Sequence, residues 1–176
     1  MPITLPIEGN GFSLRDYVAA DIRALADIEF DPQVKRYLAI PKLSKDEWIK
    51  TFNPDTATGW AVVDDNGTLA GRASLTRAKR KGHAELAVVI SKAFWGQGLG
   101  TKVAKLLVAT AFNDLEAKSL ISIVHPENRA SLRLVRSLGF RRRGVFIEDT
   151  WQDGHYIYRL SKGRITLNGT DGRKRP

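Results

Sequence analysis

Three glycines stand at alternate positions, Gly96, Gly98 and Gly100, between an apolar run and residues with helical spacing. Glycine allows left-handed backbone angles and leaves no Cβ between the backbone amides and a ligand. The first N–H groups of a helix have no partners within the helix, and the positive end of its dipole attracts anions. The pattern predicts a phosphate or pyrophosphate site between residues 95 and 101, with a flexible surface turn as the alternative.

Two common nucleotide-phosphate motifs do not match this loop. Its glycines are spaced G-x-G-x-G, whereas dinucleotide-binding folds use G-x-G-x-x-G, and the chain has no G-x-x-x-x-G-K-[ST] motif. The predicted ligand therefore carries phosphate without being bound in either of those folds.

Glu85 lies in the apolar run that leads into this loop. Alternation along a strand places Glu85, Ala87 and Val89 on one face. A carboxylate beside such an apolar wall would have a raised pKa, whereas the alternative is an ordinary glutamate that faces solvent. Farther along, Asn128 and Ser131 open a second helical pattern, where Asn is a good N-cap and Ser is tolerated in the first turn.

The other reactive residue types give weaker signals. The chain has no cysteine, which removes disulfides, thiolate nucleophiles and cysteine metal sites. His83 and His125 have no further ligand three to five residues on, and His155 lies in a predicted turn. We therefore predict no metal site and interpret the three histidines as structural or surface residues.

Composition sets the broad class of the protein. With 176 residues, the chain is long enough for one domain with a real hydrophobic core. Its net charge of +9 favours polyanionic partners, although a solubilising surface explains it equally well. No signal peptide and no apolar run of about 18 residues is found, so we expect a cytoplasmic protein without a membrane partner.

The first third of the chain is predicted to be largely helical. A short strand at 11–15 precedes a helix at 21–30, which Asp31-Pro32 ends. Pro32 suits the first position of a further helix that continues to Leu38. Ser44 and Glu47 have the spacing of a capping box for a helix at 46–52.

The rest of the chain alternates strands with two helices. We predict antiparallel strands at 59–64, 69–76 and 83–90, the first two joined by Asp65-Asn66-Gly67. A helix at 100–113 then crosses to a strand at 120–124 with local parallel pairing. A second helix ends at Gly139, and strands at 140–147 and 156–160 form a closing hairpin. We predict a single domain over residues 1–160 and a disordered basic tail over 161–176, where five Lys or Arg oppose one Asp.

Several of these motifs together resemble the GNAT superfamily of N-acetyltransferases, and most closely the branch that acetylates the N-terminal amines of ribosomal proteins. The residues that carry the resemblance stand in the family's order: Leu14-Arg15, Asp31–Leu38, Trp95–Thr101, Asn128-x-x-Ser131 and Leu138-Gly139-Phe140. The resemblance covers about residues 11–160. It implies an α/β (α+β) fold with a mixed, mostly antiparallel central sheet of six to seven strands and flanking helices.

The resemblance also implies acetyl-CoA as cosubstrate, without a metal. Its pantetheine arm would pair with Val88, Val89 and Ile90, and its pyrophosphate would bind the loop amides. The loop residues concerned are Trp95, Gly96, Gln97, Gly98, Leu99, Gly100 and Thr101. The wider family often has Gln or Arg where this chain has Trp95, an aromatic position in the ribosomal branch. Lys102, Arg133 and Arg136 are expected near the 3′-phosphate of CoA.

For the chemistry, the resemblance assigns Glu85 as the carboxylate that removes the amine's proton through water. Asn128 would contact the pantetheine arm or order a water near it, and Ser131 would face the sulfur. Many relatives have a tyrosine at the position of Val135 that protonates the leaving thiolate. Valine has no proton to give, so Ser131 or solvent must take that role.

Three hypotheses for the function remain at this stage. The first is an N-acetyltransferase that acts by direct attack on the N-terminal amine of a peptide or protein, such as a ribosomal protein. The second acetylates a small amine: a polyamine, an amino acid or an antibiotic. The third is a non-catalytic module that binds acyl-CoA or RNA, although we expect nucleic acid to contact the basic tail only incidentally. Glu148, Asp149 and Asp153 are candidates for holding a cationic amine, and the protein is expected to be a monomer or a homodimer.

Overall fold

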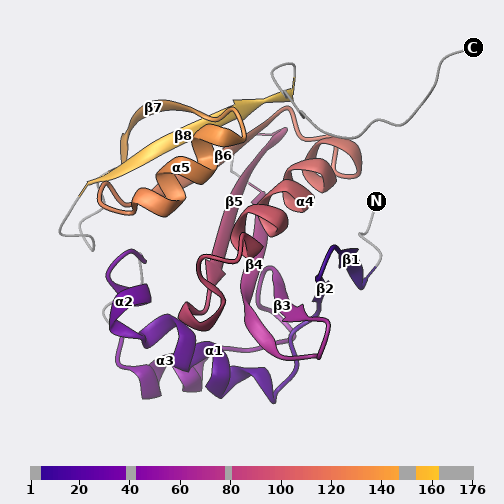
Figure 1. The fold of residues 1–176 in the computed structure, drawn as a ribbon, viewed down its shortest axis with the longest axis vertical. Helices are drawn as coiled ribbons and strands as arrows, with labels where there is room; N and C mark the ends of the chain where they lie inside the picture. The colour runs from indigo at the N-terminus through magenta and orange to yellow at the C-terminus, as the bar shows by residue number, and fades with distance from the viewer. Residues whose placement is uncertain (1–4, 39–42, 78–80, 147–153, 163–176) are drawn as a thin grey trace, which may run out of the picture.

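The computed structural model describes residues 5–38, 43–77, 81–146 and 154–162. They form an eight-stranded sheet in the order β1-β2-β3-β4-β5-β6-β8-β7 (Figure 1). The strands are β1 Ile7–Gly9, β2 Phe12–Arg15, β3 Trp60–Asp64, β4 Leu69–Arg77, β5 His83–Ile90, β6 Ser119–Val124, β7 Arg141–Phe146 and β8 His155–Ser161. The helices are α1 Asp21–Phe30, α2 Pro32–Lys35, α3 Lys45–Thr51, α4 Leu99–Asn113 and α5 Arg129–Ser137.

The predicted mixed, mostly antiparallel sheet is confirmed, but it has one or two more strands than the six to seven expected. β1 is the strand that the sequence analysis did not predict. It is only three residues long and therefore too short to show an alternating pattern. It pairs with β2 through Gly9 and Phe12, and Asn10-Gly11 connects the two strands. That Asn-Gly pair is a hairpin signal that would have indicated β1.

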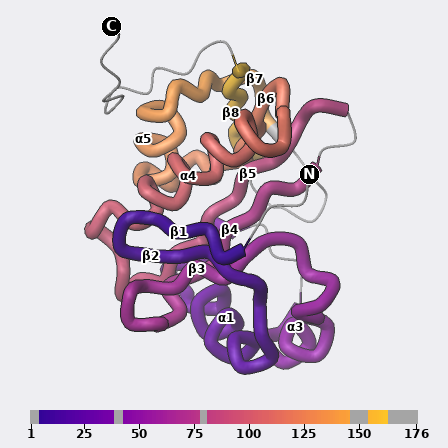
Figure 2. Tube along the Cα trace, turned by 90° about the vertical axis from the view of Figure 1, so that its right-hand side faces the viewer, coloured from indigo at the N-terminus to yellow at the C-terminus, as the bar shows by residue number. Residues whose placement is uncertain are grey.

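The two faces of the sheet are covered by different helices. Along β3, Val62 belongs to the large core beneath α4, whereas its neighbour Ala61 packs with Leu25 of α1 and Trp48 of α3. Successive side chains of a strand point to opposite faces, so α4 and the α1–α3 pair cover opposite sides. Figure 2 shows α1 and α3 side by side, away from α4.

β5 and β6 pair in parallel over a very short stretch. The pairs are His83 with Ser119, Ala84 with Leu120, and Glu85 with Ile121. Beyond Glu85 the strands diverge, although β5 stays paired with β4 as far as Ile90. Figure 1 shows β5 and the β6–β8–β7 half of the sheet separating toward α2. The edges of β5 and β6 that face this gap therefore have no neighbouring strand within the part of the chain that the structure describes.

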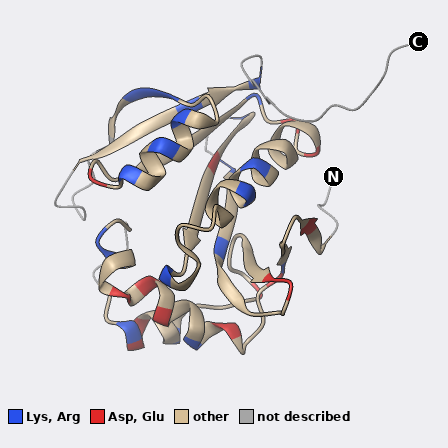
Figure 3. Cartoon of the chain, in the orientation of Figure 1, with Lys and Arg blue, Asp and Glu red and all other residues tan. Residues whose placement is uncertain are grey.

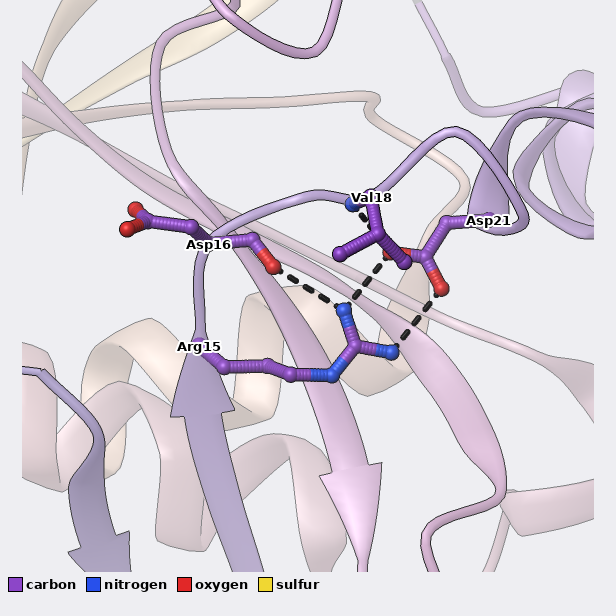
Figure 4. A network of polar contacts seen from close by, with 4 residues as sticks. All are labelled: Arg15, Asp16, Val18 and Asp21. Atoms are coloured by element: carbon purple, nitrogen blue, oxygen red, sulfur yellow. Dashed lines mark hydrogen bonds and ion pairs between the residues drawn. The ribbon is translucent and has the colours of Figure 1, made fainter.

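An ion pair holds the start of α1 against the end of β2. Arg15 donates from Nη1 and Nη2 to the two carboxylate oxygens of Asp21, at 2.7 and 2.9 Å (Figure 4). The backbone N–H of Val18 donates to the same carboxylate at 2.9 Å. Burial alone would raise the pKa of Asp21, but the hydrogen bonds from Arg15 and Val18 outweigh it, so the pKa lies below the usual 3.8.

We expect Asp21→Asn to lower the free energy of unfolding by about 2 kcal/mol, because Arg15 would lose its ionised partner. Asp16→Asn is the matched control, since Asp16 is exposed and binds Arg15 only through its backbone carbonyl. Urea unfolding at neutral pH measures the difference. The lowered pKa means that Asp21 contributes stability above its ordinary pKa and loses it as the pH falls through the folded value. The free energies of unfolding of the two variants should therefore converge at low pH. A difference that stays constant with pH would contradict the role assigned to Asp21.

Two further expectations concern membrane-spanning helices and the C-terminal tail. Within them, no helix is long and apolar enough to cross a membrane. Residues 163–176 of the predicted tail lie outside the described residues, as do Glu148, Asp149 and Asp153.

Candidate functional site

The gap between β5 and β6 opens into a cleft of about 1300 Å³. It reaches from the glycine loop and α5 on one side to the segment after α2 on the other. Nearly all residues that the sequence predicts for the site line this cleft: Glu85, Val88, Val89, Ile90, Trp95, Gly96, Gly98, Leu99, Gly100, Thr101, Asn128 and Ser131. Gln97 is the exception. Its side chain turns back and donates to the Ala93 carbonyl at 3.0 Å.

The glycine loop presents backbone N–H groups to the cleft. Within the described chain, the amides from Gly96 to Gly100 have no protein acceptor, and the first backbone bonds of α4 run from Thr101 and Lys102 to the Gly98 carbonyl. Gly98 is the N-cap of α4, and both it and Gly96 have φ of +75°. This left-handed conformation costs glycine nothing and aims successive amides in one direction. The loop has the chemistry of an anion site.

Trp95 is 43% exposed at the entrance of the cleft. Its indole Nε1 donates to the carbonyl of Ile90 at 2.8 Å, so the ring is fixed across the last residue of β5. A polar contact from this nitrogen to phosphate is therefore unavailable in this geometry. The ring instead closes the end of the gap between the strands.

Glu85 lies at the point where the two strands begin to separate. It is half-buried, and within the described segments no side chain bonds its carboxylate. Burial raises the pKa of Glu85 above the usual 4.5, as the apolar face predicted from the sequence requires. A half-buried carboxylate with a raised pKa is a stronger base than an exposed glutamate, which suits Glu85 to accept a proton in this cleft.

Asn128 and Ser131 lie on the α5 wall of the cleft. Asn128 is the N-cap of α5, and its side-chain oxygen accepts from the Ser131 N–H at 3.0 Å. The capping role that the residue types suggest is therefore present. Val135 is buried one turn farther along α5, so this wall has no phenol at the position discussed above.

The cleft is also lined by residues that the sequence analysis did not include in the site. The rings of Tyr37 and His125 have centroids 5.5 Å apart, and those of His125 and His155 are 5.1 Å apart and edge to face. All three line the cleft, although they come from the segment after α2, the end of β6 and the start of β8. No sequence spacing connects them, so only the fold could bring them together.

The charges of the cleft are unevenly distributed. Arg129 and Arg133 of α5 line it beside the glycine loop. Figure 3 shows basic residues along α5 and β7, whereas acidic residues gather on α1 and α3. Of the predicted 3′-phosphate contacts, Lys102 instead donates to the Asn10 carbonyl at 3.1 Å, and Arg136 donates to Tyr158 at 3.4 Å. Arg133 alone of these three lines the cleft.

The geometry can bind a phosphate-bearing ligand along the gap between β5 and β6. The loop amides supply donors for its phosphates, and the unpaired strand edges supply donors and acceptors for an extended arm. The described residues include no group of three His, Asp or Glu arranged to hold a metal ion.

A family model described as "Acetyltransferase (GNAT) domain" matches residues 12–141. The chain belongs to this family. The GNAT acetyltransferases use acetyl-CoA, whose phosphates and amide-bearing arm fit the unpartnered loop amides and strand edges of the cleft. The predicted family, the fold and the assignment as an acyltransferase are confirmed, which argues against a non-catalytic binding module.

The similar proteins include acetyltransferases named for a polyamine and others named for a ribosomal protein. The chain is 29% identical to spermidine N(1)-acetyltransferase of Escherichia coli K12 over 154 residues, which covers 84% of this chain and 82% of the relative. A Vibrio cholerae spermidine N-acetyltransferase structure with CoA and spermine is similar in fold, with a TM-score of 0.74, 20% identity, and coverage of 88% and 97%. The ribosomal-protein-S5-alanine acetyltransferase of Vibrio fischeri gives a TM-score of 0.69, 14% identity, and coverage of 90% and 97%.

These likenesses support the GNAT fold without selecting the ribosomal branch. Both solved structures are less than 25% identical to this chain, and one is a spermidine acetyltransferase whereas the other is a ribosomal-protein acetyltransferase. The acceptor must therefore be argued from the cleft itself.

Proposed function

We propose that this GNAT protein transfers the acetyl group of acetyl-CoA to the α-amine of a peptide or protein N-terminus, with a ribosomal protein as one candidate. The observation that carries the proposal is that one cleft of about 1300 Å³ is lined by the glycine loop, by Glu85, and by Tyr37, His125 and Arg72. The glycine loop is the proposed anion site. Tyr37, His125 and Arg72 are proposed to lie on the acceptor side of Glu85. We further propose that residues 1–160 are one acetyltransferase domain.

In this proposal the amides from Gly96 to Gly100, within the predicted loop Trp95–Thr101, hold the pyrophosphate. Val88, Val89 and Ile90 pair with the pantetheine arm. Acetyl-CoA supplies an activated acetyl group, which the amine attacks directly. Glu85 receives the amine's surplus proton, through water where the amine does not reach it. Ser131 or solvent gives a proton to the sulfur that leaves, since Val135 cannot.

The acidic residues of the cleft favour a peptide over a polyamine. A polyamine carries several positive charges and requires several carboxylates to replace its hydration. Among the described residues that line the cleft, the acids are Glu85 and Glu127. Glu127 is exposed and faces Arg36 at 3.5 Å, which leaves Glu85 as the acid without a basic partner in these segments.

A polyamine acceptor is the second candidate, and the similarity to spermidine N(1)-acetyltransferase is the observation in its favour. An assay of acceptor-dependent CoA release separates the two. It would compare peptides with free N-termini, spermidine, single amino acids and an aminoglycoside, with mass spectrometry of the products. We expect the highest kcat/KM for a peptide, acetylated at its α-amine. A higher value for spermidine would overturn the peptide proposal, and release with none of them would overturn both.

Asn128 provides a separate test of the acetyl-CoA side. Asn128→Ala removes the N-cap and should destabilise the fold by about 1 kcal/mol, whereas Asn128→Ser keeps a capping oxygen. If the amide also contacts the pantetheine arm, we expect the serine variant to melt like the native protein but to bind acetyl-CoA several-fold more weakly. Calorimetric titration and thermal melting measure the two effects. Native affinity in Asn128→Ser would restrict this residue to capping.

A further inference from the structure

Arg72 is a charged residue in the cleft that the roles proposed above do not use. It lies on β4 directly opposite Val89 of β5, and its neighbour on the same face, Ser74, lies opposite Ala87. Paired residues in a sheet point to the same face, so Arg72 shares the face of Glu85. Arg72 lines the cleft, and its side chain is 28% exposed.

One side of the Arg72 guanidinium is fixed by a buried acid. Its Nε donates to Glu29 of α1, whose side chain is only 2% exposed. A guanidinium has five N–H donors, and this bond uses one of them. Within the described segments, Nη1 and Nη2 have no hydrogen-bond partner. The pair with Glu29 therefore orients the fork and leaves its terminal donors available.

We infer that Arg72 recognises the acceptor by donating from its terminal nitrogens to a carbonyl oxygen of a molecule whose amine lies at Glu85. This inference rests on the proposed acetyl transfer in the same cleft. It assigns the acceptor to the class of α-amino amides and peptides, and it predicts that amines without a carbonyl group near the reacting nitrogen gain nothing from Arg72.

The spacing of the two residues suits such an acceptor. Four residues of β5 separate Glu85 from Val89, the partner of Arg72, which corresponds to about 13 Å along the strand. The first two or three residues of an extended peptide span about 7 to 10 Å. The Arg72 side chain covers the remaining distance, so the first carbonyl groups of a bound peptide come within its range.

The charge balance favours a neutral carbonyl over a carboxylate. Glu29 already compensates the positive charge of Arg72, so the pair is neutral as a unit. A carboxylate would add an uncompensated negative charge to a cleft that also contains Glu85, and this is costly where water is partly excluded. A peptide carbonyl satisfies the free donors without adding charge.

Arg72→Lys tests the inference, because lysine keeps a cation for Glu29 but removes the planar fork. Two acceptors of similar length are compared, an alanyl dipeptide amide and an alkyl diamine without a carbonyl. We expect kcat/KM for the dipeptide amide to fall about 10-fold, mainly through KM, with no change for the diamine or for the Kd of acetyl-CoA. Arg77→Lys is the matched control, since Arg77 is exposed at the end of the same strand.

The possible outcomes separate this inference from the proposed function. Equal losses for both acceptors, or weaker acetyl-CoA binding, would overturn the role of Arg72 because they indicate a structural or cosubstrate effect. If the native protein acetylates the diamine but not the dipeptide amide, the carbonyl requirement is overturned while acetyl transfer remains in place. If an amino-acid amide is acetylated but no peptide is, the peptide proposal fails and the Arg72 inference survives. If no acceptor is acetylated, calorimetry of the dipeptide amide with the CoA complex decides. Equal affinity for the dipeptide amide in Arg72→Lys and Arg77→Lys would then overturn the inference.

Discussion

Replacing Glu85 by glutamine should lower kcat for acetyl transfer by about 100-fold or more, with little change in acetyl-CoA affinity. The expected loss is that of a general base, which contributes roughly 10²- to 10⁴-fold. Glutamine keeps the size of the side chain at its position opposite Ile121, but it cannot take a proton. Steady-state kinetics with a saturating acceptor, together with calorimetry for acetyl-CoA, would show the two effects separately.

The control for this variant is Glu8→Gln, an exposed glutamate on strand β1 outside the cleft. It should retain native kcat. If Glu85→Gln also retains native kcat, the proton leaves by another route and the assignment of Glu85 fails.

The Glu85→Gln substitution should raise stability although it lowers activity. Burial raises the pKa of Glu85 above 4.5, so the folded state holds this proton more tightly than the unfolded state. Stability attributable to Glu85 is therefore present at low pH and is lost as the pH rises through the folded pKa. Glu85→Gln should melt at a higher temperature than the native protein at pH 8, and the difference should disappear in acid. The kcat of the native protein should fall as the pH decreases through the same raised pKa.

Gly98→Val should weaken acetyl-CoA binding about 100-fold. A β-branched residue at φ of +75° lies near the upper end of the 1 to 3 kcal/mol that left-handed non-glycine residues cost. Without acetyl-CoA, the loop relieves this strain by turning its amides away from the cleft. Binding requires the strained conformation again, so the cost of the strain appears as lost affinity. No atom lies within 4 Å of the position that a Cβ at Gly98 would occupy. A steric clash therefore does not explain the expected loss.

Gly67→Val is the matched control for that strain. Gly67 lies in the turn between β3 and β4, with φ of +78° and nothing within 4 Å of an added Cβ. The substitution should lower stability, yet leave acetyl-CoA affinity unchanged. Equal losses of affinity in the two variants would show that general destabilisation, and not the loop amides, controls binding.

Local patterns in the sequence predicted the glycine loop and the N-cap of α5. The glycine loop and the N-cap at Asn128 are short segments whose backbone chemistry depends on neighbouring residues. The capping box at Ser44 and Glu47 is also present as predicted, with a bond of 2.8 Å from the Ser44 N–H to the Glu47 carboxylate. The predicted burial of Glu85 followed from alternation along one strand.

The residues of the proposed acceptor side could not be predicted in the same way. Tyr37, Arg72, His125 and His155 come from four separate segments, and no spacing along the chain links them. Their proximity depends on how α1 and α2 pack across the sheet, which is set by contacts such as that of Glu29 with Arg72. A histidine without a nearby ligand in the sequence indicates a surface or core residue, and only the fold shows that His125 and His155 share a wall of the cleft.

The three-residue pairing between β5 and β6 also affects how the molecule holds together. A bound pantetheine arm would occupy the edges that these strands leave empty and would act as a removable ninth strand. The cosubstrate would then be a structural component as well as a reactant, because it would bridge the two halves of the sheet beyond the three residue pairs that join β5 to β6. Release of CoA would weaken the contact between the two halves of the sheet, and binding would strengthen it. Turnover and the stability of the fold would therefore depend on the same hydrogen bonds.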